Sequence, residues 1–167
     1  MSQRSVRSVT LPRNSKKSRR TVSRTCVKES KSRTLKQAGS GREETITFPI
    51  RLTGLNEYIS AERTNRFKAA KIKRSTQDEL NLYIRHEINA GRLHRHEKPC
   101  VLEIVWTEAN NKRDADNIEF ATKFIQDALV EMGIFPDDNR KYITGHRHSV
   151  VTGNEYSVQV TIKETKK

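Results

Sequence analysis

The 167-residue chain has only two cysteines, Cys26 and Cys100, and it has no long apolar run. Two cysteines this far apart cannot form the disulfide framework of a small secreted domain, so a reducing cytoplasm fits best. No stretch approaches the roughly 18 apolar residues that a membrane-spanning helix needs, which argues against a membrane protein. No apolar segment follows the first arginines, which argues against a secretory signal.

Acidic residues are almost absent from the first quarter of the chain. Residues 1–42 hold 13 Lys or Arg and one acid, Glu29, whereas residues 43–167 hold 20 basic and 19 acidic side chains. The first segment also has no aromatic residue and no apolar period, so it cannot bury enough surface to offset its ordering entropy. We therefore predict a disordered basic arm, 1–42, that a Gly-Ser-Gly joint at 39–41 connects to a folded domain, 43–167.

The net charge of +13 argues for a polyanionic partner. Our preferred interpretation of the arm is a nonspecific contact with nucleic acid. Two alternatives stay open: an organelle transit peptide, which is also rich in Arg and Ser and poor in acids, and a solvated tail with no role.

The first half of the domain shows a strand and a long helix. Alternating apolar residues at 46–52 predict a half-buried strand that ends at Gly54, and Pro49 within it favours an edge strand or a bulge. Asn56 is a candidate cap for a helix that Gly91 ends, with a break near Ser75-Thr76. One face of this helix carries Leu80, Ile84 and Ile88.

The second half begins with residues 100–107, which are apolar enough for a central strand. A polar loop, 110–117, leads into a helix of about four turns, 118–132, with Gly133 at its C-terminal end. Residues 141–151 and 155–163 predict two strands joined by a tight turn at Gly153-Asn154. The order β, α, β, α, β, β indicates an α/β or α+β domain.

Carboxylates are concentrated on both sides of the predicted helix 118–132. Asp114 and Asp116 precede it, and Asp137 and Asp138 follow it. If the two loops return beside each other, these side chains converge, and like charges held together call for a cation. Mg²⁺ takes one or two carboxylates plus waters and phosphate oxygens, so a Mg²⁺ site that acts on a phosphodiester is one hypothesis.

Lys123 lies within the same helix and has two interpretations. Its ammonium group could stabilise negative charge on a reacting phosphate. It could also form an ordinary i,i+4 pair with Asp127, worth only about 0.3–0.5 kcal/mol. Asp116 and Asn117 have an equally simple alternative as helix caps.

Two His-x-His pairs, His94/His96 and His146/His148, raise a transition-metal alternative, because such residues share one face of a strand. No cysteine pair at metal-binding spacing supports zinc.

The string Arg113-Asp114-Ala115-Asp116-Asn117, followed by Lys123 and Asp127-Ala128-Leu129, then Gly133 and Asp137-Asp138, resembles the RusA-like Holliday-junction resolvases. The segments 55–58, 63–66 and 71–73 resemble the phage and prophage branch of that family. The resemblance covers about residues 44–163 and leaves out the arm. In the family the lysine comes one turn after D-x-D-N, whereas here Phe120 holds that place and Lys123 comes about one turn later.

The resemblance implies a homodimeric endodeoxyribonuclease with a mixed sheet and helices packed on it. It would use Mg²⁺, with Mn²⁺ as a substitute, to resolve four-way DNA junctions by paired symmetric nicks in recombination and repair. It would act in the cytoplasm, near the nucleoid, and be bacterial or phage-encoded. By position, Asp114, Asp116 and Asp138 match the catalytic carboxylates and metal ligands, Asp137 matches a neighbouring acid, and Lys123 matches the catalytic lysine.

Six basic residues are candidates for contacts with DNA phosphates: Lys68, Lys71, Lys73, Arg74, Lys112 and Arg113. Their alternative is a solvated helix face. At the level of the whole protein, the rivals are a non-catalytic DNA-binding protein and a basic protein that contacts RNA.

Deletion of residues 1–42 is expected to weaken DNA binding without regard to sequence. Because each phosphate contact contributes about −0.9 to the slope of log K against log salt on duplex DNA, the slope is expected to flatten. The measurement is a salt titration of duplex binding for both chains, and an unchanged slope would show that the arm does not contact phosphates.

Overall fold

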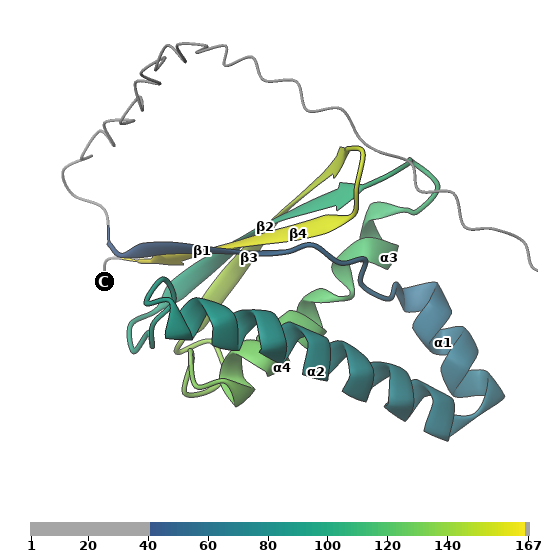
Figure 1. Cartoon of the computed structure of the whole chain (residues 1–167), viewed down its shortest axis with the longest axis horizontal. Coiled ribbons are helices and arrows are strands. Elements are labelled where there is room, and N and C mark those ends of the chain that lie inside the picture. Colours follow the sequence, from purple (N-terminus) through teal and green to yellow (C-terminus); the bar gives the residue numbers. More distant parts are fainter. Residues whose placement is uncertain (1–40, 166–167) are drawn as a thin grey trace, which may run out of the picture. The chain divides into compact units, whose positions relative to one another are not determined.

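The structure is a computed structural model that describes residues 41–165. The predicted arm, 1–42, lies outside the described residues except for Gly41 and Arg42. In chain order (Figure 1) the elements are β1 Glu43–Phe48, α1 Leu55–Thr64, α2 Arg66–Asn89, β2 Cys100–Glu108, α3 Ala115–Glu119, α4 Thr122–Glu131, β3 Ile143–Thr152 and β4 Ser157–Glu164. No helix within residues 41–165 has the length and apolarity needed to cross a membrane.

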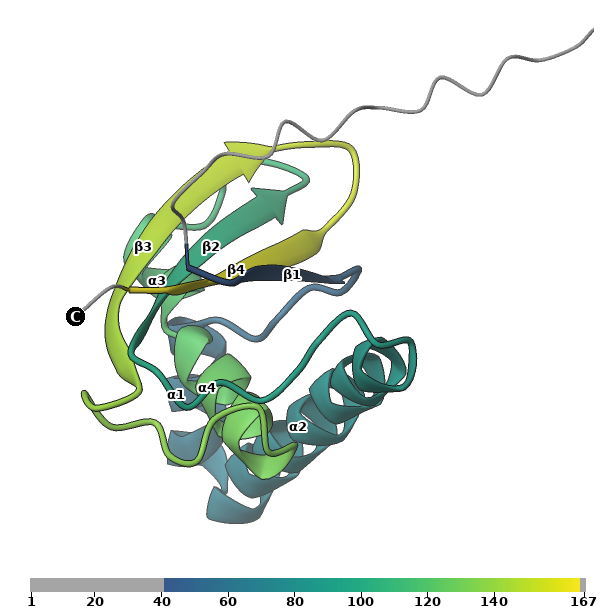
Figure 2. The ribbon, with the colours of Figure 1, turned by 90° about the vertical axis from the view of Figure 1, so that its left-hand side faces the viewer.

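The four strands form one mixed sheet with the order β1-β4-β2-β3. Strand β4 pairs antiparallel with both β1 and β2, and β3 pairs parallel with β2. The helices gather on one face of this sheet (Figure 2). The α+β class and the mixed sheet expected from the sequence are thus confirmed.

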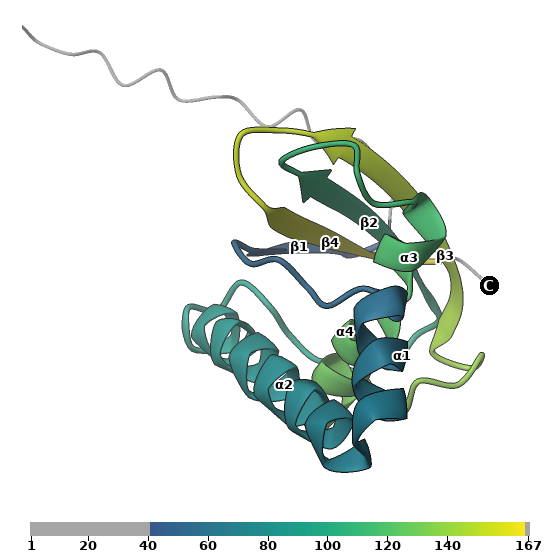
Figure 3. The same cartoon turned by 90° about the vertical axis from the view of Figure 1, so that its right-hand side faces the viewer.

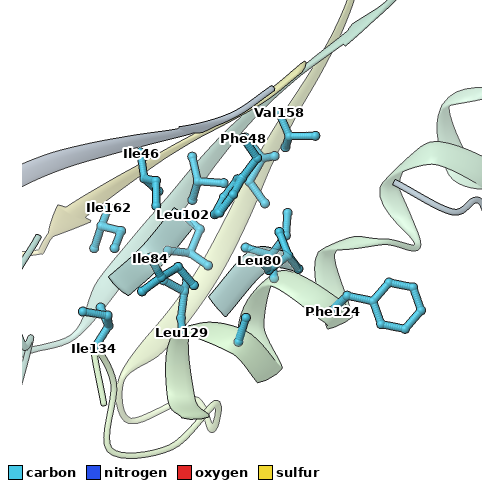
Figure 4. Close-up of a cluster of buried hydrophobic side chains, with 14 of the residues drawn as sticks. Ile46, Phe48, Leu80, Ile84, Leu102, Phe124, Leu129, Ile134, Val158 and Ile162 are labelled. Atoms are coloured by element: carbon cyan, nitrogen blue, oxygen red, sulfur yellow. The ribbon is translucent and has the colours of Figure 1, made fainter. Parts of the chain in front are cut away.

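The core lies between the sheet and helices α2 and α4. Alternate residues of β2 are buried, as are Leu80 and Ile84 on α2 and Leu129 on α4. Figure 4 shows these helical side chains directed at the sheet residues Ile46, Leu102, Val158 and Ile162. The predicted apolar face of the long helix is therefore its packed face, and β2 is the central strand that its composition predicts.

Both predicted C-terminal strands are present, as β3 and β4, but the tight turn between them does not pair them as a hairpin. Strands β3 and β4 do not pair, because β2 lies between them. Their connection passes over the end of β2, where the Gly153 N–H donates to the Glu108 carbonyl at 2.9 Å. A Cβ at Gly153 would lie 2.5 Å from Thr107 Cγ2, so a larger residue there would have to displace the Thr107 side chain. Strand β2 therefore has a hydrogen-bonded neighbour on each side, β4 on one and β3 on the other.

The predicted helix boundaries also need correction. Helix α2 runs unbroken through Ser75-Thr76, and the break lies at Asn65, whose backbone is extended. The Asn65 side-chain oxygen accepts from the Phe67 N–H at 2.8 Å and so caps α2. Helix α1 begins at Leu55, one residue before the predicted cap Asn56. Gly91, at φ +67°, does end the long helix.

The predicted four-turn helix is two helices, α3 and α4. Between them, Ala121, Lys123 and Phe124 each donate a backbone hydrogen bond three residues back, which tightens the chain locally. The tilted Phe120 and Phe124 rings both lie near the ring of Tyr58 on α1, with centroids 5.5 and 5.8 Å away. These aromatic contacts hold α1 against the α3–α4 junction.

A buried histidine ties β1 and β4 to the segment that precedes β2. The His96 ring is fully buried, with Nε2 3.1 Å from Glu44 Oε2 and Nδ1 3.2 Å from Glu164 Oε1. Both nitrogens can donate only when the imidazole is protonated. Burial by itself would raise the pKa of Glu164, but hydrogen bonds from His96 and Lys98 together lower it.

The lowered Glu164 pKa predicts that the fold loses stability in acid. A carboxylate whose pKa is lower in the folded state stabilises the fold above its ordinary value of 4.5. That stabilisation disappears as the pH falls through the folded-state value. Urea unfolding between pH 7 and 3 is expected to show this fall, with a smaller pH dependence in Glu164→Gln. The exposed Glu97→Gln is the control, and equal pH dependence in all three proteins would contradict the prediction.

Candidate active site

The R-D-A-D-N segment, 113–117, follows the end of β2 after a short loop, and its arginine is held inside the protein. Arg113 Nη1 donates to Glu108 Oε1 at 2.8 Å, and Nη2 donates to the Leu52 carbonyl at 3.2 Å. Both charged side chains are nearly buried, with 12% and 8% exposed. Because a buried carboxylate needs a cationic partner, Glu108 fixes where the chain turns toward α3. DNA contact by Arg113 stays a prediction, and the guanidinium already has two protein partners.

Asn117 connects the same segment to the start of α1. Its side-chain oxygen accepts from the Asn56 N–H at 2.9 Å and thus caps α1 from a different part of the chain. Gly54 makes this contact possible, since a Cβ there would lie 2.5 Å from Arg113 Nη2 and 2.7 Å from Asn117 Oδ1. The sequence suggested Asn117 as a cap, but it caps a helix 61 residues earlier.

Asp114 and Asp116, which alternate with these structural residues, face the solvent. Asp114 is the N-cap residue of α3 and Asp116 lies in its first turn. Both are exposed, and neither side chain makes a hydrogen bond or ion pair within residues 41–165. Their carboxylate oxygens are therefore free to bind a cation or a donor from outside the described part of the chain.

The structure brings Lys123, in the first turn of α4, into direct contact with Asp138, in the loop that follows α4. The Lys123 ammonium donates to Asp138 Oδ2, and it also lies 2.8 Å from Asp127 Oδ1. The other oxygen of Asp127 lies 3.1 Å from the ammonium of Lys73 on α2. Four alternating charges thus join α2, α4 and the loop that follows α4. Lys123 thus makes both the i,i+4 pair with Asp127 and a contact with Asp138, one of the two aspartates that follow the helix.

This arrangement keeps both partners of the central pair charged. Hydrogen bonds to Asp127 and Asp138 raise the pKa of Lys123. The hydrogen bond from Lys123 lowers the pKa of Asp138, although partial burial opposes the change. At neutral pH, Lys123 is therefore a cation suited to a phosphate and is not a base.

Asp137 has a local structural task. Its Oδ1 accepts from the Asp138 N–H at 2.7 Å, and its Oδ2 accepts from the Asn139 side-chain amide at 2.6 Å. Such contacts stabilise a turn and set the direction of the neighbouring Asp138. The two aspartates that are adjacent in sequence thus make different contacts.

The basic residues predicted to contact phosphates differ in whether they already form an ion pair within the protein. Lys68, Lys71, Arg74 and Lys112 are exposed and make no ion pair within residues 41–165. Lys73 points toward α4 and pairs with Asp127 at 3.1 Å. The basic part of α2 therefore adjoins the Lys123 network through Lys73.

The two His-x-His pairs lie in different places and contact other side chains. His94 and His96 contact the carboxylate of Glu44. On β3, His148 Nδ1 accepts from the Trp106 indole N–H at 3.2 Å, and His146 lies 2.9 Å from the Gln126 side-chain amide. Burial, followed by the neighbouring His148, lowers the pKa of His146.

Within residues 41–165, no three or more His, Cys, Asp or Glu side chains are gathered at a point where they could hold a metal ion. The pair Asp114/Asp116 and the pair Asp137/Asp138 therefore do not form one cluster. The sequence predicted such a cluster if the two loops lay beside each other. No protein-family model matches this sequence, and no curated protein matches it.

Gly54→Ala is expected to disturb this site without altering a charged group. The new methyl group would displace Arg113 or Asn117, and such overpacking costs about 1–3 kcal/mol of unfolding free energy. Gly145→Ala is the matched control, because a Cβ there meets nothing within 4 Å. Urea unfolding of both variants measures the difference, and equal stabilities would contradict the close approach at Gly54.

Proposed function

We propose that this protein is a Mg²⁺-dependent, structure-selective endodeoxyribonuclease that resolves four-way DNA junctions by paired nicks. The contact between Lys123 and Asp138 carries the proposal. These residues are 15 positions apart, and the sequence marks both, through the RusA-like order of motifs, as parts of one active site. Their contact supports the assignment, because a helix and a following loop could have left them far apart.

The residues present suit a hard cation. Asp114 and Asp116 offer exposed carboxylates with no partner within residues 41–165. One or two carboxylates are what Mg²⁺ usually takes from a protein, with waters and phosphate oxygens completing its shell. We propose Asp114 and Asp116 as the ligands that the protein would supply. The resemblance also implies Asp138 as a third ligand and Asp137 as its neighbour, but Asp138 contacts Lys123 and is not gathered with Asp114 and Asp116 within residues 41–165. Mn²⁺, which also prefers oxygen ligands, would replace Mg²⁺.

The chemistry proposed is hydrolysis of a phosphodiester bond. A bound Mg²⁺ would polarise the phosphate and lower the pKa of an attacking water. Lys123 would offset the negative charge that develops on the phosphate oxygens. Asp127 and Asp138 hold the Lys123 ammonium in place, so the charge is already oriented before DNA binds. Asp127 is thus a positioning residue, which the sequence suggested only as an ordinary helix pair.

Paired nicks require two identical sites, so we further propose a homodimer. A two-fold symmetric dimer presents its sites to two equivalent strands of a four-way junction. Recognition would depend mainly on phosphates and DNA shape. The net charge of +13 suits such a partner.

Asp116→Asn is expected to abolish cleavage and leave junction binding intact. The loss should exceed about 100-fold, the upper range for removing even an outer partner of a bound metal. The assay is cleavage of a labelled synthetic four-way junction with Mg²⁺ or with chelator, and linear duplex and splayed arms serve as substrate controls. Asp78→Asn, which removes an exposed carboxylate from α2, is the matched variant.

The outcomes separate the candidate functions. Symmetric nicks on the junction alone, only with Mg²⁺, would support a resolvase. Cutting of all branched DNA would support a nuclease without that selectivity. Binding without cutting under several divalent metals would instead support a non-catalytic DNA-binding protein. Retained cleavage in Asp116→Asn would overturn the active-site assignment.

A further inference from the structure

The corner between α1 and α2, residues 62–74, exposes the ring of Phe67. At 69% it is the most exposed large apolar side chain within residues 41–165. The corner points away from the sheet (Figures 1 and 3). A single exposed apolar side chain is common on protein surfaces, so exposure alone assigns no role to Phe67. The basic side chains around the ring distinguish it from an ordinary exposed residue.

Positive charge is concentrated around this ring. The corner holds six Lys or Arg and one acid, whereas the rest of α2, residues 75–89, holds one Arg and three acids. Five of the six basic side chains are exposed and make no ion pair within residues 41–165: Arg63, Arg66, Lys68, Lys71 and Arg74. Unpaired positive charge of this density is complementary to a chain of phosphates.

The Phe67 ring is accompanied by the guanidinium group of Arg66. The Arg66 guanidinium lies over it, 5.0 Å from the ring centroid. The hydrogen bond from the Phe67 N–H to the side chain of Asn65 fixes the backbone from which the ring projects. Aromatic rings and guanidinium planes are the surfaces on which unpaired bases stack, and such stacking tolerates any base sequence.

Apart from Phe67, no large apolar side chain of the corner is exposed. Ala69 is buried, Ile72 is half-buried, and the exposed Ala70 adds only a methyl group. An anionic membrane would need a broader apolar face to hold the corner stably. One exposed ring among free cations therefore suits a nucleic acid better than a lipid surface.

We propose that the corner binds unpaired nucleotides of branched DNA. Phe67 stacks on a base, and the five free cations hold the flanking phosphates. The choice of DNA rests on the proposed function, since Lys73 in the same corner pairs with Asp127 of the candidate active site. Bases at a branch point are the easiest to unstack, so this contact would favour branched DNA over linear duplex.

The first test measures binding of the full-length protein to a short oligothymidylate in the presence of chelator. Phe67→Ala is expected to weaken binding about 5- to 150-fold, the usual effect of losing one base–aromatic stack. The slope of log K against log salt should not change, because the phosphate contacts remain. Lys71→Ala should instead flatten that slope by about 0.7. Leu82→Ala is the matched control, because Leu82 is 67% exposed on the same helix but outside the basic corner.

The second test detects the stacking directly. The only tryptophan of the chain, Trp106, is buried, so it gives a nearly constant background. Phe67→Trp should retain binding, and its added fluorescence should be quenched by the oligonucleotide. Leu82→Trp should show no quenching.

Unchanged affinity in Phe67→Ala, or equal quenching at both positions, would overturn the inference. Binding of the corner to anionic phospholipid vesicles but not to DNA would also overturn the inference. Neither test depends on metal or cleavage, so the two proposals can fail separately. Junction cutting with no effect at Phe67 would overturn only this inference, and stacking with no cutting under any metal would overturn only the nuclease.

Discussion

The apolar row of β2 has to be shielded from water, and the arrangement of the domain depends on this constraint. Leu102, Ile104 and Trp106 face the helical layer, and all three are buried. Strands β3 and β4 flank β2, so its backbone groups are paired on both sides. This burial extends to Glu108 at the end of the strand, whose carboxylate then requires Arg113. The burial of one strand thus determines where the R-D-A-D-N segment starts.

That segment combines structural and exposed residues in alternation. Arg113 and Asn117 turn inward and hold the loop before α1, while Asp114 and Asp116 turn outward at the start of α3. The contacts of the inward residues position the outward ones without using their carboxylates. The cation site that we propose would benefit from this division, because free carboxylates would otherwise pair with nearby donors.

Alternating charges link the candidate site to the basic corner of α2. Asp127 contacts the ammonium groups of Lys73 and Lys123, and Lys123 also contacts Asp138. Asp127, which contacts both Lys73 and Lys123, reduces the repulsion between these two cations. The free cations of the corner, by contrast, have no such partner within residues 41–165. This difference separates charges that organise the fold from charges available to a phosphate chain.

Local patterns predicted the elements better than their ends and pairings. The apolar run of β2 and the apolar face of α2 were correct, because each follows from a pattern within one segment. The alternation at 46–52 was correct only in part, since β1 ends at Phe48. The break at Ser75-Thr76 was wrong, because a continuous packed face outweighs the weak helix propensity of two residues. The strands β3 and β4 were correct, but the pairing implied by the tight turn was wrong, because the local pattern of a strand does not specify its neighbour.

The sequence by itself determined the α+β class, the central place of β2 and the chemical types available at the site, since composition and period are local properties. Only the tertiary structure decided that Lys123 meets Asp138 and that Asn117 caps a helix 61 residues earlier. It also decided that His96 lies between two glutamates and that Phe67 stands exposed among cations. These contacts join distant segments, and their geometry is set by how the sheet and helices pack together.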